Sequence, residues 1–392
     1  MFSTGIKRSV NAFFDRFVRP EFSFAGRSWL FFQVCGGTGV VSAIVLMLTL
    51  AVFSDLSVTL MGALIVADLI ACLALTMITK VILGEERLTY CHHEISLILV
   101  TASIAWLVDQ PVLSFLDVSI LGLGLGLACG RLGCLMAGCC HGTPARCGVR
   151  YGPAHVAAGF SPYYGGARFV PIQIIEAIWV AAIVFAGSWM VLLGVPAGKA
   201  LSLYICAYGA GRFFFEFLRA DTDRAYFKGF SESQWISLLL MVLVVTGEFA
   251  GVLPFQWWNV AVTALVLIVM LVVAIRRRSS NYRLLLPRHL EELAHALDAT
   301  SNHADQNGGG SRVRSSGVPV DCTSLGVQIS AGRIKVAGKH LYHYAVSNKT
   351  ANMTEDSARV VARLILQLRH PVGTSDLIAG NRGVFHLLVS PP

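Results

Sequence analysis

The fold of this chain is decided by an apolar run at positions 112–136, which reads VLSFLDVSILGLGLGLACGRLGCLM. A helix that crosses the roughly 30 Å of hydrocarbon in a bilayer needs about 20 apolar residues, and this run supplies them. Seven further runs of similar character lie at 29–53, 57–82, 94–108, 171–195, 200–218, 234–253 and 257–275. The run at 94–108 is short and the run at 234–253 contains Glu248, so the sequence predicts seven or eight membrane-spanning helices.

The composition agrees with a polytopic membrane protein. Of the 392 residues, 55% are hydrophobic and 14% are charged, whereas soluble proteins carry about 25% charged residues. This balance argues against a cytosolic enzyme and excludes disorder, collagen and coiled coil as the main architecture. The net charge of +8 is not organised into a basic stripe interleaved with aromatic residues, so no nucleic-acid partner is predicted.

Composition divides the chain into four segments. We expect an N-terminal amphipathic or interfacial segment at 1–28, a transmembrane domain at 29–275, a basic stop and flexible linker at 276–320 and a small soluble α+β module at 321–392. In the first segment, Phe13, Phe14 and Phe17 lie beside basic residues, which is typical either of a helix on the membrane surface or of a solvated lead-in helix. The predicted fold class is an all-α polytopic membrane protein with a small C-terminal soluble α+β module.

Local signals define the last two segments more closely. The linker begins with Arg276, Arg277 and Arg278, and positions 300–320 are rich in Ser, Asn and Gly. In the module we expect strands at 325–336 and 341–347 joined by a turn at Gly338, a helix at 355–369 that begins after Thr354 and ends before Pro371, and a last strand at 383–389. No catalytic pattern stands out in this module.

Polar side chains inside the spans point to function. Ionisable groups in the bilayer cost about 2.5 to 3.5 kcal/mol each on insertion scales, so they persist mainly where they are paired or line a polar cavity. In the run 200–218, one helical stripe carries Tyr208, Arg212, Glu216 and Arg219. Arg212 and Glu216 can pair within the helix. Two interpretations stay open: an ion pair that only makes Arg212 tolerable, or an arginine that binds an anion.

A second polar group lies at the end of the span 112–136 and consists of Gly130, Arg131, Gly133, Gly138 and Gly142. Glycines at this density let the backbone approach a ligand and offer N–H groups to a phosphate, or they allow close packing between helices. Packing does not account for Arg131, whose planar guanidinium matches phosphate oxygens.

Two smaller polar groups lie near the starts of spans. Gln173 and Glu176 are one turn apart and project to the same helix face. His92 and His93 precede the span at 94–108, where an imidazole can act as a general base or a ligand, or is merely solvated.

In their order and spacing, these motifs resemble the bacterial prolipoprotein diacylglyceryl transferase family. The resemblance covers about residues 29–253 and rests on the segments 90–94, 130–133, 171–176 and 208–212, together with Glu216, Arg219 and Gln234. It implies a multi-pass protein of the bacterial inner (plasma) membrane. It also implies transfer of diacylglyceryl from phosphatidylglycerol to the lipobox cysteine of a lipoprotein precursor, with release of glycerol phosphate. Phosphatidylglycerol, lipoprotein precursors and membrane lipids are the implied partners.

The resemblance also implies roles for individual residues. Arg131 and Arg212 would bind the phosphate and stabilise its developing charge, Glu216 would orient Arg212, and His92 or His93 would take the thiol proton. The substrate pocket would include Gly130, Gly133, Gly138, Gly142, Gln173, Glu176, Tyr208, Arg219 and Gln234. No metal or other cofactor is required for this chemistry.

The chain departs from the family pattern in its signature loop. Cys134 stands where family members usually carry Asn, Cys139 stands where they carry an acidic residue, and residues 92–94 read His-His-Glu rather than His-Gly-Gly. The loop instead gathers Cys134, Cys139, Cys140, His141 and Cys147. These residues could bind zinc, form a disulfide or supply a reactive thiol, although the paired spacing of ordinary zinc motifs is absent.

The departures leave two further functions open. One is a related transferase that moves a lipid moiety to a different acceptor, and the other is a non-catalytic lipid-binding or metal-binding membrane protein.

Loop charges bear on the orientation of the chain in the membrane. With eight spans and a cytoplasmic N-terminus, the inside segments hold thirteen cations, namely Lys7, Arg8, Arg16, Arg19, Arg27, Lys80, Arg87, Arg146, Arg150, Arg168, Arg219, Arg224 and Lys228. The opposite side keeps Lys199 alone. This count favours the signature loop inside, whereas the family resemblance implies that it faces outside the cytoplasm. The sequence leaves its sidedness open.

Overall fold

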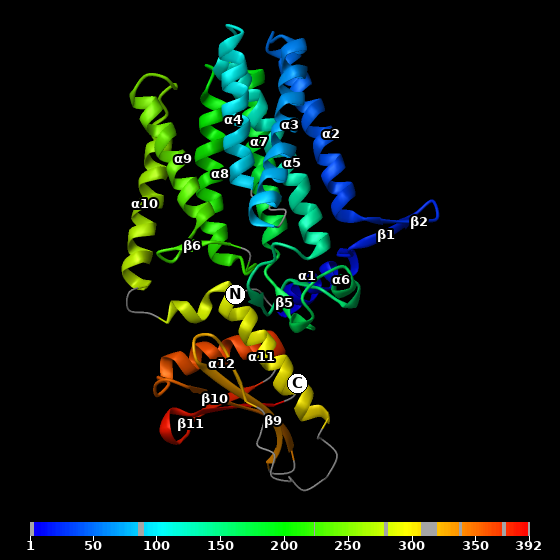
Figure 1. Ribbon diagram of the computed structural model, residues 1–392, viewed down its shortest axis with the longest axis vertical. Helices are drawn as coiled ribbons and strands as arrows, with labels where there is room; N and C mark the ends of the chain where they lie inside the picture. The colour runs from blue at the N-terminus through cyan, green and yellow to red at the C-terminus, as the bar shows by residue number, and fades with distance from the viewer. Residues whose placement is uncertain are drawn as a thin grey trace.

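A bundle of long helices stands on a water-exposed layer that contains the sheets of the protein (Figure 1). The computed structural model describes residues 4–84, 90–222, 224–277, 281–306, 320–336, 339–370 and 374–390. The expected turn at Gly338, the helix stop at Pro371, Arg278 and linker positions 307–319 lie outside the described residues. The predicted fold class is confirmed, because apolar helices and a sheet-containing C-terminal module are both present.

Each of the eight apolar runs forms a helix. The helices are α2 (Phe31–Phe53), α3 (Val58–Leu83), α4 (Tyr90–Leu107), α5 (Val112–Ala137), α7 (Ile172–Leu192), α8 (Lys199–Phe215), α9 (Glu232–Phe249) and α10 (Trp257–Arg277). Among the described residues, six of them are long and apolar enough to cross a membrane, all except α4 and α8. The helix α8 has 17 residues, and α4 begins with the polar stretch from Tyr90 to Glu94. Both departures from a simple apolar span occur where the polar motifs lie.

The helix α5 forms the centre of the bundle and packs against α2, α4, α7 and α8. Of its most apolar stretch, 56% is buried inside the protein, a larger share than in any other candidate span among the described residues. A Cβ atom at Gly122 would lie 2.4 Å from Met47, and one at Gly124 would lie 2.4 Å from Tyr204. These two glycines therefore allow close helix packing, as small residues do in membrane bundles.

Two buried carboxyl groups link neighbouring helices. Asp117 of α5 accepts hydrogen bonds from the backbone N–H groups of Gly198 and Leu201, both at 2.7 Å, and so caps the first turn of α8. Thr101 of α4 donates a hydrogen bond of 3.2 Å to Asp68 of α3. These bonds hold the helices that carry the polar motifs in register.

The N-terminal segment forms a helix, α1 (Thr4–Phe17), and a hairpin of β1 (Glu21–Phe24) and β2 (Arg27–Leu30). Phe14 is 7% exposed and packs into the water-exposed layer, whereas Phe13 and Phe17 are each 52% exposed. The helix is thus amphipathic in its packing, and its place on a membrane surface stays a prediction. The hairpin was not predicted, and it delays the start of the first span to Phe31 because Trp29 pairs with Phe22.

The loop between α5 and α7 is a small folded unit. It contains β3 (Pro144–Ala145), β4 (Val149–Arg150), α6 (Pro153–Ala157), a 3₁₀ turn at Pro162–Tyr164 and β5 (Arg168–Phe169), with the strand order β3-β5-β4. Arg168 of β5 donates two hydrogen bonds to Asp15 of α1, at 3.0 and 2.6 Å. The hydrogen bond to Arg168 holds the pKa of Asp15 below its usual range, so α1 is clamped to the loop at neutral pH.

A second short connection follows α8. A 3₁₀ turn at Glu216–Leu218 leads into a hairpin of β6 (Tyr226–Phe227) and β7 (Phe230–Ser231), directly before α9. Ser231 and Gln234 form a capping box at the start of α9. This places residues 216–234 beside the signature loop, where Gly142 and Arg219 form an isolated β-bridge.

The C-terminal module contains the predicted strands and helix. Its elements are β8 (Asp321–Cys322), β9 (Val327–Val336), β10 (Lys339–Asn348), α12 (Glu355–Arg369), β11 (Ser375–Ala379) and β12 (Phe385–Val389). The antiparallel sheet has the order β11-β12-β10-β9-β8. Thr354 caps α12 by accepting a hydrogen bond from the N–H group of Ser357, at 3.3 Å. The edge strands β8 and β11 were not predicted, since one is two residues long and the other is largely exposed.

The expected flexible linker at 276–320 is wrong in its central part. A 3₁₀ turn at Tyr282–Leu285 is followed by α11 (Pro287–Gln306), a helix of 20 residues. Leu290, Leu293, Ala294 and Leu297 are each at most 3% exposed and follow the i, i+3, i+4, i+7 spacing of an amphipathic helix. The polar composition of positions 300–306 concealed this apolar stripe, which packs against β9.

The C-terminal module and the signature loop, residues 138–170, share one hydrophobic core. Residues of α1, the 138–170 loop, α11 and the module belong to a single buried cluster. The ring of His295 on α11 lies 4.6 Å from that of Tyr163 in the loop. In Figure 1 this layer covers one end of the bundle. The basic segments counted above that the structure describes lie at this same end, which is the end of the signature loop.

Replacing Leu297 by alanine should destabilise this layer. Leu297 is fully buried, so truncation should cost about 2 to 5 kcal/mol of unfolding free energy. The matched control is Leu285→Ala, because Leu285 is 57% exposed and should change stability by at most about 0.5 kcal/mol. Denaturant unfolding in detergent would compare them. Equal effects of the two substitutions would contradict the docking of α11.

Candidate active site

The centre of the candidate site is the carboxylate of Glu176, which is 1% exposed in the first turns of α7. Arg131 reaches it from α5, with its Nε 2.9 Å from Oε2. Arg212 reaches it from α8, with its Nη1 3.5 Å from Oε1. Two guanidinium groups that are 81 positions apart in the sequence therefore converge on one carboxylate.

The ion pairs continue outward from Arg212. Its Nη2 lies 2.7 Å from Oε1 of Glu216, which confirms the pair expected within the helix. Arg219 Nη1 lies 3.8 Å from Oε2 of Glu176, and its Nε and Nη2 donate hydrogen bonds to both oxygens of Asp221 at 3.1 and 3.0 Å. Arg224 pairs with both Glu216 and Asp221.

This ion-pair network joins Arg131, Arg212, Arg219, Arg224, Glu176, Glu216 and Asp221. Among the residues that the structure describes, this network joins four guanidinium groups to three carboxylates. The network thus carries one more positive charge than negative. A buried excess of positive charge favours an anion, and guanidinium groups match phosphate oxygens.

Neutral hydroxyl groups complete the surroundings of Glu176 and Arg212. The hydroxyl group of Tyr208 donates to Oε1 of Glu176 at 3.2 Å, and Arg212 donates to the hydroxyl oxygen of Ser233 at 3.3 Å. The hydroxyl groups of Tyr90 and Tyr204 lie 2.5 Å apart, and the ring of Tyr90 contacts that of Tyr208. The predicted stripe on α8 therefore faces one polar interior.

Gln173 and Gln234, both predicted to belong to the site, form hydrogen bonds with the backbone around the ion-pair network. Gln173 donates from Nε2 to the carbonyl of Cys139 and the hydroxyl of Tyr151, at 3.0 and 3.1 Å. Gln234 donates to the carbonyl of Phe213 at 3.1 Å and accepts from the N–H group of Ser231. Both side chains are buried, and their contact with substrate stays a prediction.

The signature glycines differ in what they do. Gly138 ends α5 in the left-handed region with φ of 86°, and a Cβ on Gly142 would lie 2.3 Å from the carbonyl oxygen of Val170. These two positions require glycine for a turn and a close backbone approach. Gly133 packs against Phe32 of α2, whereas a Cβ on Gly130 would meet no atom within 4 Å.

The histidines lie beside the network rather than in it. His92 Nε2 lies 2.8 Å from Oε1 of Glu232, and both side chains are more than a third exposed. His93 lines a separate cavity, and its buried Nδ1 has no hydrogen-bond partner in the described part of the chain. In the described part of the chain, neither histidine is hydrogen-bonded or ion-paired to the arginines of the network, so their role as general base stays a prediction.

Two cavities flank α5. One, of about 270 Å³, has mostly apolar walls from α2, α3, α4 and α5 and is also lined by Asp68 and His93. The other, of about 260 Å³, lies beyond the end of α5 and is lined by Cys139, Cys140 and Asp221, together with Glu291 of α11. Asp221 belongs to the ion-pair network, so the second cavity borders it directly.

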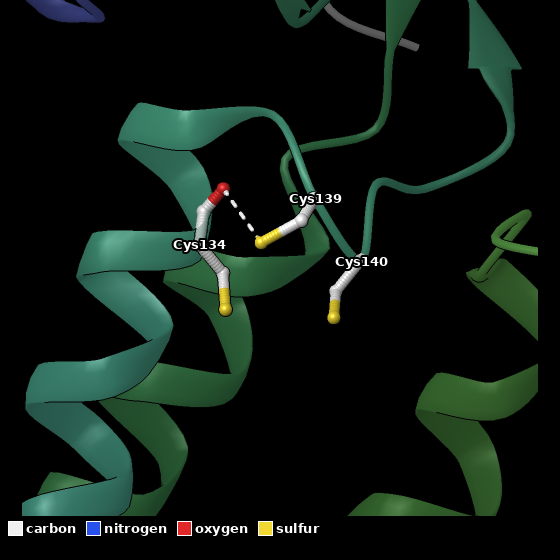
Figure 2. A group of neighbouring side chains, drawn as sticks. All are labelled: Cys134, Cys139 and Cys140. Carbon is white, nitrogen blue, oxygen red and sulfur yellow. Dashed lines mark hydrogen bonds between the residues drawn. The ribbon is translucent and has the colours of Figure 1, made fainter. Parts of the chain in front are cut away.

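The cysteine-rich loop gathers three thiols. The Sγ atoms of Cys134, Cys139 and Cys140 all lie within 4.8 Å of one another (Figure 2). The other two candidate ligands do not join them. His141 lies among the rings of Phe160, Tyr164 and Phe169, and Cys147 lies near the backbone of α1.

Asp221 and His141, which lie outside the spans, have shifted pKa values. Burial opposes the charged form of Asp221, but Arg219 and Arg224 outweigh it and hold the pKa of this carboxyl well below its usual range. Burial lowers the pKa of His141, which therefore remains a neutral imidazole at pH 7. Asp221 thus remains an anion in the network at any physiological pH.

Sequence reasoning missed three members of the site. Asp221 and Arg224 join the ion pairs, and Ser233 contacts Arg212. They lie in the connection between α8 and α9, where Arg224 was counted only as a loop charge. The available signal was the charged sequence from Arg219 to Arg224, which follows directly on the buried stripe.

The polar interior lies within the part of the chain for which relatives are known. Residues 94–250 match the model of the prolipoprotein diacylglyceryl transferase family. The matched segment contains Arg131, Glu176, Arg212 and Glu216, and it covers less than half of the chain. The resemblance inferred from the motifs is confirmed.

Individual relatives carry the name phosphatidylglycerol–prolipoprotein diacylglyceryl transferase. The protein from Clostridium tetani is 33% identical over 135 residues, which cover 34% of this chain and 52% of the relative. One from Clostridium perfringens is 35% identical over 133 residues, and one from Dehalococcoides mccartyi is 38% identical over 134 residues, each covering 33% of this chain and 49% or 48% of the relative. The chain spans about half the length of these curated relatives.

Replacing Glu176 by glutamine should destabilise the bundle strongly. The substitution leaves buried guanidinium groups without their shared carboxylate, and breaking a buried pair costs about 3 to 5 kcal/mol. The control is Glu355→Gln, which removes an ion pair to Arg359 whose partners are both 63% exposed and should cost at most about 1 kcal/mol. Thermal unfolding in detergent would show a large difference if the network is as described, and similar shifts would refute it.

Proposed function

We propose that this protein transfers a diacylglyceryl group from phosphatidylglycerol to the lipobox cysteine of a lipoprotein precursor and releases glycerol phosphate. The observation that carries the proposal is the convergence of Arg131 and Arg212 on Glu176 inside the bundle. The names of the relatives support both the reaction and the lipid donor.

The charges of the network suit the leaving group. When the bond between the glyceryl carbon and the phosphate oxygen breaks, negative charge develops on the phosphate. Arg131 and Arg212 are at most 7% exposed, and fixed cations in such a dry site stabilise developing charge better than water does. Glu176 and Glu216 keep the two guanidinium groups in place before the lipid arrives.

The two cavities suit the two parts of the reaction. The apolar cavity between α2, α3, α4 and α5 would receive an acyl chain of the donor. The polar cavity beyond α5 would admit the acceptor peptide and release glycerol phosphate into water. Between them the lipid headgroup would meet the arginines, with Tyr208 and Arg219 as further contacts. His92 or His93 would accept the thiol proton.

A second candidate function is transfer of a lipid moiety to a different acceptor. The observation that favours it is the replacement of two polar family positions by Cys134 and Cys139, which line or adjoin the acceptor side of the site. Mass spectrometry of lipids and lipoproteins after deletion of the gene would separate the two reactions. A non-catalytic lipid-binding or metal-binding protein remains the third candidate, and absence of any transfer by pure protein would favour it.

Expression in a bacterium depleted of its own transferase should restore growth, and pure protein should modify a lipobox peptide in vitro. Arg212→Lys should lower the transfer rate by about 100-fold or more, because a lysine ammonium cannot replace the planar guanidinium fork. Arg359→Lys is the control, since Arg359 is exposed on α12. A fully active Arg212→Lys variant would contradict the proposed role.

We propose that the protein lies in the bacterial inner membrane with its candidate site and its C-terminal module on one side. Cysteines at Ala158 and Ala351 should react with an impermeant thiol reagent from the same side, and a cysteine at Asp109 from the other. Peptide mass spectrometry would identify each labelled position in cells and in inverted vesicles. Labelling of positions 109 and 158 from one side would contradict the arrangement.

A further inference from the structure

Three thiols meet at the end of α5 because the chain folds back on itself there. Cys134 lies in the last turn of the helix, and Gly138 ends it in the left-handed region. Cys140 also has a positive φ, of 52°, which is unusual for a residue other than glycine. The turn places the thiols of Cys139 and Cys140 over Cys134, as Figure 2 shows. The backbone is thus shaped to bring these three side chains together.

The spacing of the sulfur atoms fits a single soft metal ion. Zinc binds thiolates at about 2.3 Å, so the sulfurs of a tetrahedral site are about 3.8 Å apart. The three Sγ atoms lie within 4.8 Å of one another, and a contraction of about 1 Å or less would bring them into range. Three thiolates around Zn²⁺ would carry one net negative charge, and the end of α5 that holds Cys134 also holds Arg131.

The site is open on one side. Cys139 and Cys140 both line the polar cavity beyond α5, which would receive the acceptor peptide under the proposed function. Among the described residues, His141 and Cys147 are directed elsewhere, so neither supplies a fourth ligand. Three protein ligands with one open position are the arrangement of catalytic rather than structural zinc sites.

We propose that Cys134, Cys139 and Cys140 bind a zinc ion whose fourth position takes the thiol of the acceptor cysteine. This inference rests on the proposed function and replaces its histidine base with a zinc-bound thiolate. Binding to zinc converts the acceptor thiol to a thiolate and releases its proton to water. The thiolate sulfur then attacks the glyceryl carbon of the lipid. A sulfur–carbon bond forms, the carbon–oxygen bond to phosphate breaks, and glycerol phosphate leaves with the electron pair.

This arrangement places thiol activation beside the arginines. Cys134 follows Arg131 by one helical turn, and Asp221 of the ion-pair network lines the same cavity as Cys140. The histidines are less well placed, because His92 is paired with Glu232 and His93 lines the apolar cavity on the lipid side. Nucleophile and leaving group would then be activated from neighbouring positions on α5.

Metal analysis of the full-length protein, purified without chelator, tests the ligand set. We expect about one zinc ion per chain in the native protein and in Cys147→Ser, the matched control. Cys139→Ser and Cys140→Ser should each lower the zinc affinity by at least about tenfold, since even residues behind the ligands contribute 10 to 100-fold. Zinc-free native protein after growth and purification in zinc, or a disulfide among these cysteines in mass spectra, would overturn the inference.

Cobalt substitution tests the open position. The Co²⁺-loaded native protein should show sulfur-to-cobalt charge-transfer absorption in the near ultraviolet, and a lipobox peptide should increase it. The same peptide with serine in place of its cysteine should leave it unchanged. An equal response to both peptides would refute thiol binding.

The outcomes separate this inference from the proposed function. Transfer activity that persists in zinc-free Cys140→Ser protein would refute thiol activation by zinc and leave the transferase intact. Zinc binding and a thiol response without any transfer from phosphatidylglycerol would refute the function and retain the site.

Discussion

The contact between Glu176 and the guanidinium groups of α5 and α8 is the constraint on which the structure depends. Without the carboxylate, Arg131 would lose its ion pair and Arg212 would lose one of its two, inside an apolar bundle where unpaired charges are costly. One anion on α7 therefore fixes the relative positions of three helices. Because Arg131, Arg212 and Arg219 share this one carboxylate, its single negative charge does not offset all three, and an attraction for an anion is retained.

The same constraint explains why two helices of the bundle are poor membrane spans. The helix α8 turns into a 3₁₀ segment at Glu216 so that its last residues can reach Arg224 and Asp221, and α4 begins with residues that face Tyr204 and Glu232. Neighbouring helices bury most of α8, and they also bury Cys91 and Glu94 at the start of α4, so these stretches need not be uniformly apolar. The polar residues of α4 and α8 belong to the candidate site, and most of them are buried inside the bundle.

How far the sequence could predict this molecule depends on the range of the interactions. Arg212 and Glu216 are four residues apart on one helix, so their pairing follows from helical geometry. The apolar runs predict the eight helices for the same reason, because each is a local pattern. Glu176 as the shared partner of two arginines depends on how α5, α7 and α8 pack, which spacing along the chain does not determine. The helix α11 was missed because its apolar stripe covers one face among polar residues, and only the core of the neighbouring layer explains its burial.

The shared core of the water-exposed layer has a consequence for biosynthesis. Phe14 near the beginning of the chain, Tyr164 in its middle and Val361 near its end belong to the same buried cluster. A ribosome adds about 5 to 20 residues per second, so the first two wait for many seconds before the third emerges. The bundle can insert into the membrane while translation continues, but the core of the layer beside the candidate site is completed only after synthesis has reached the module. The candidate site of a nascent chain thus lacks this neighbouring layer until residues around Val361 have been made.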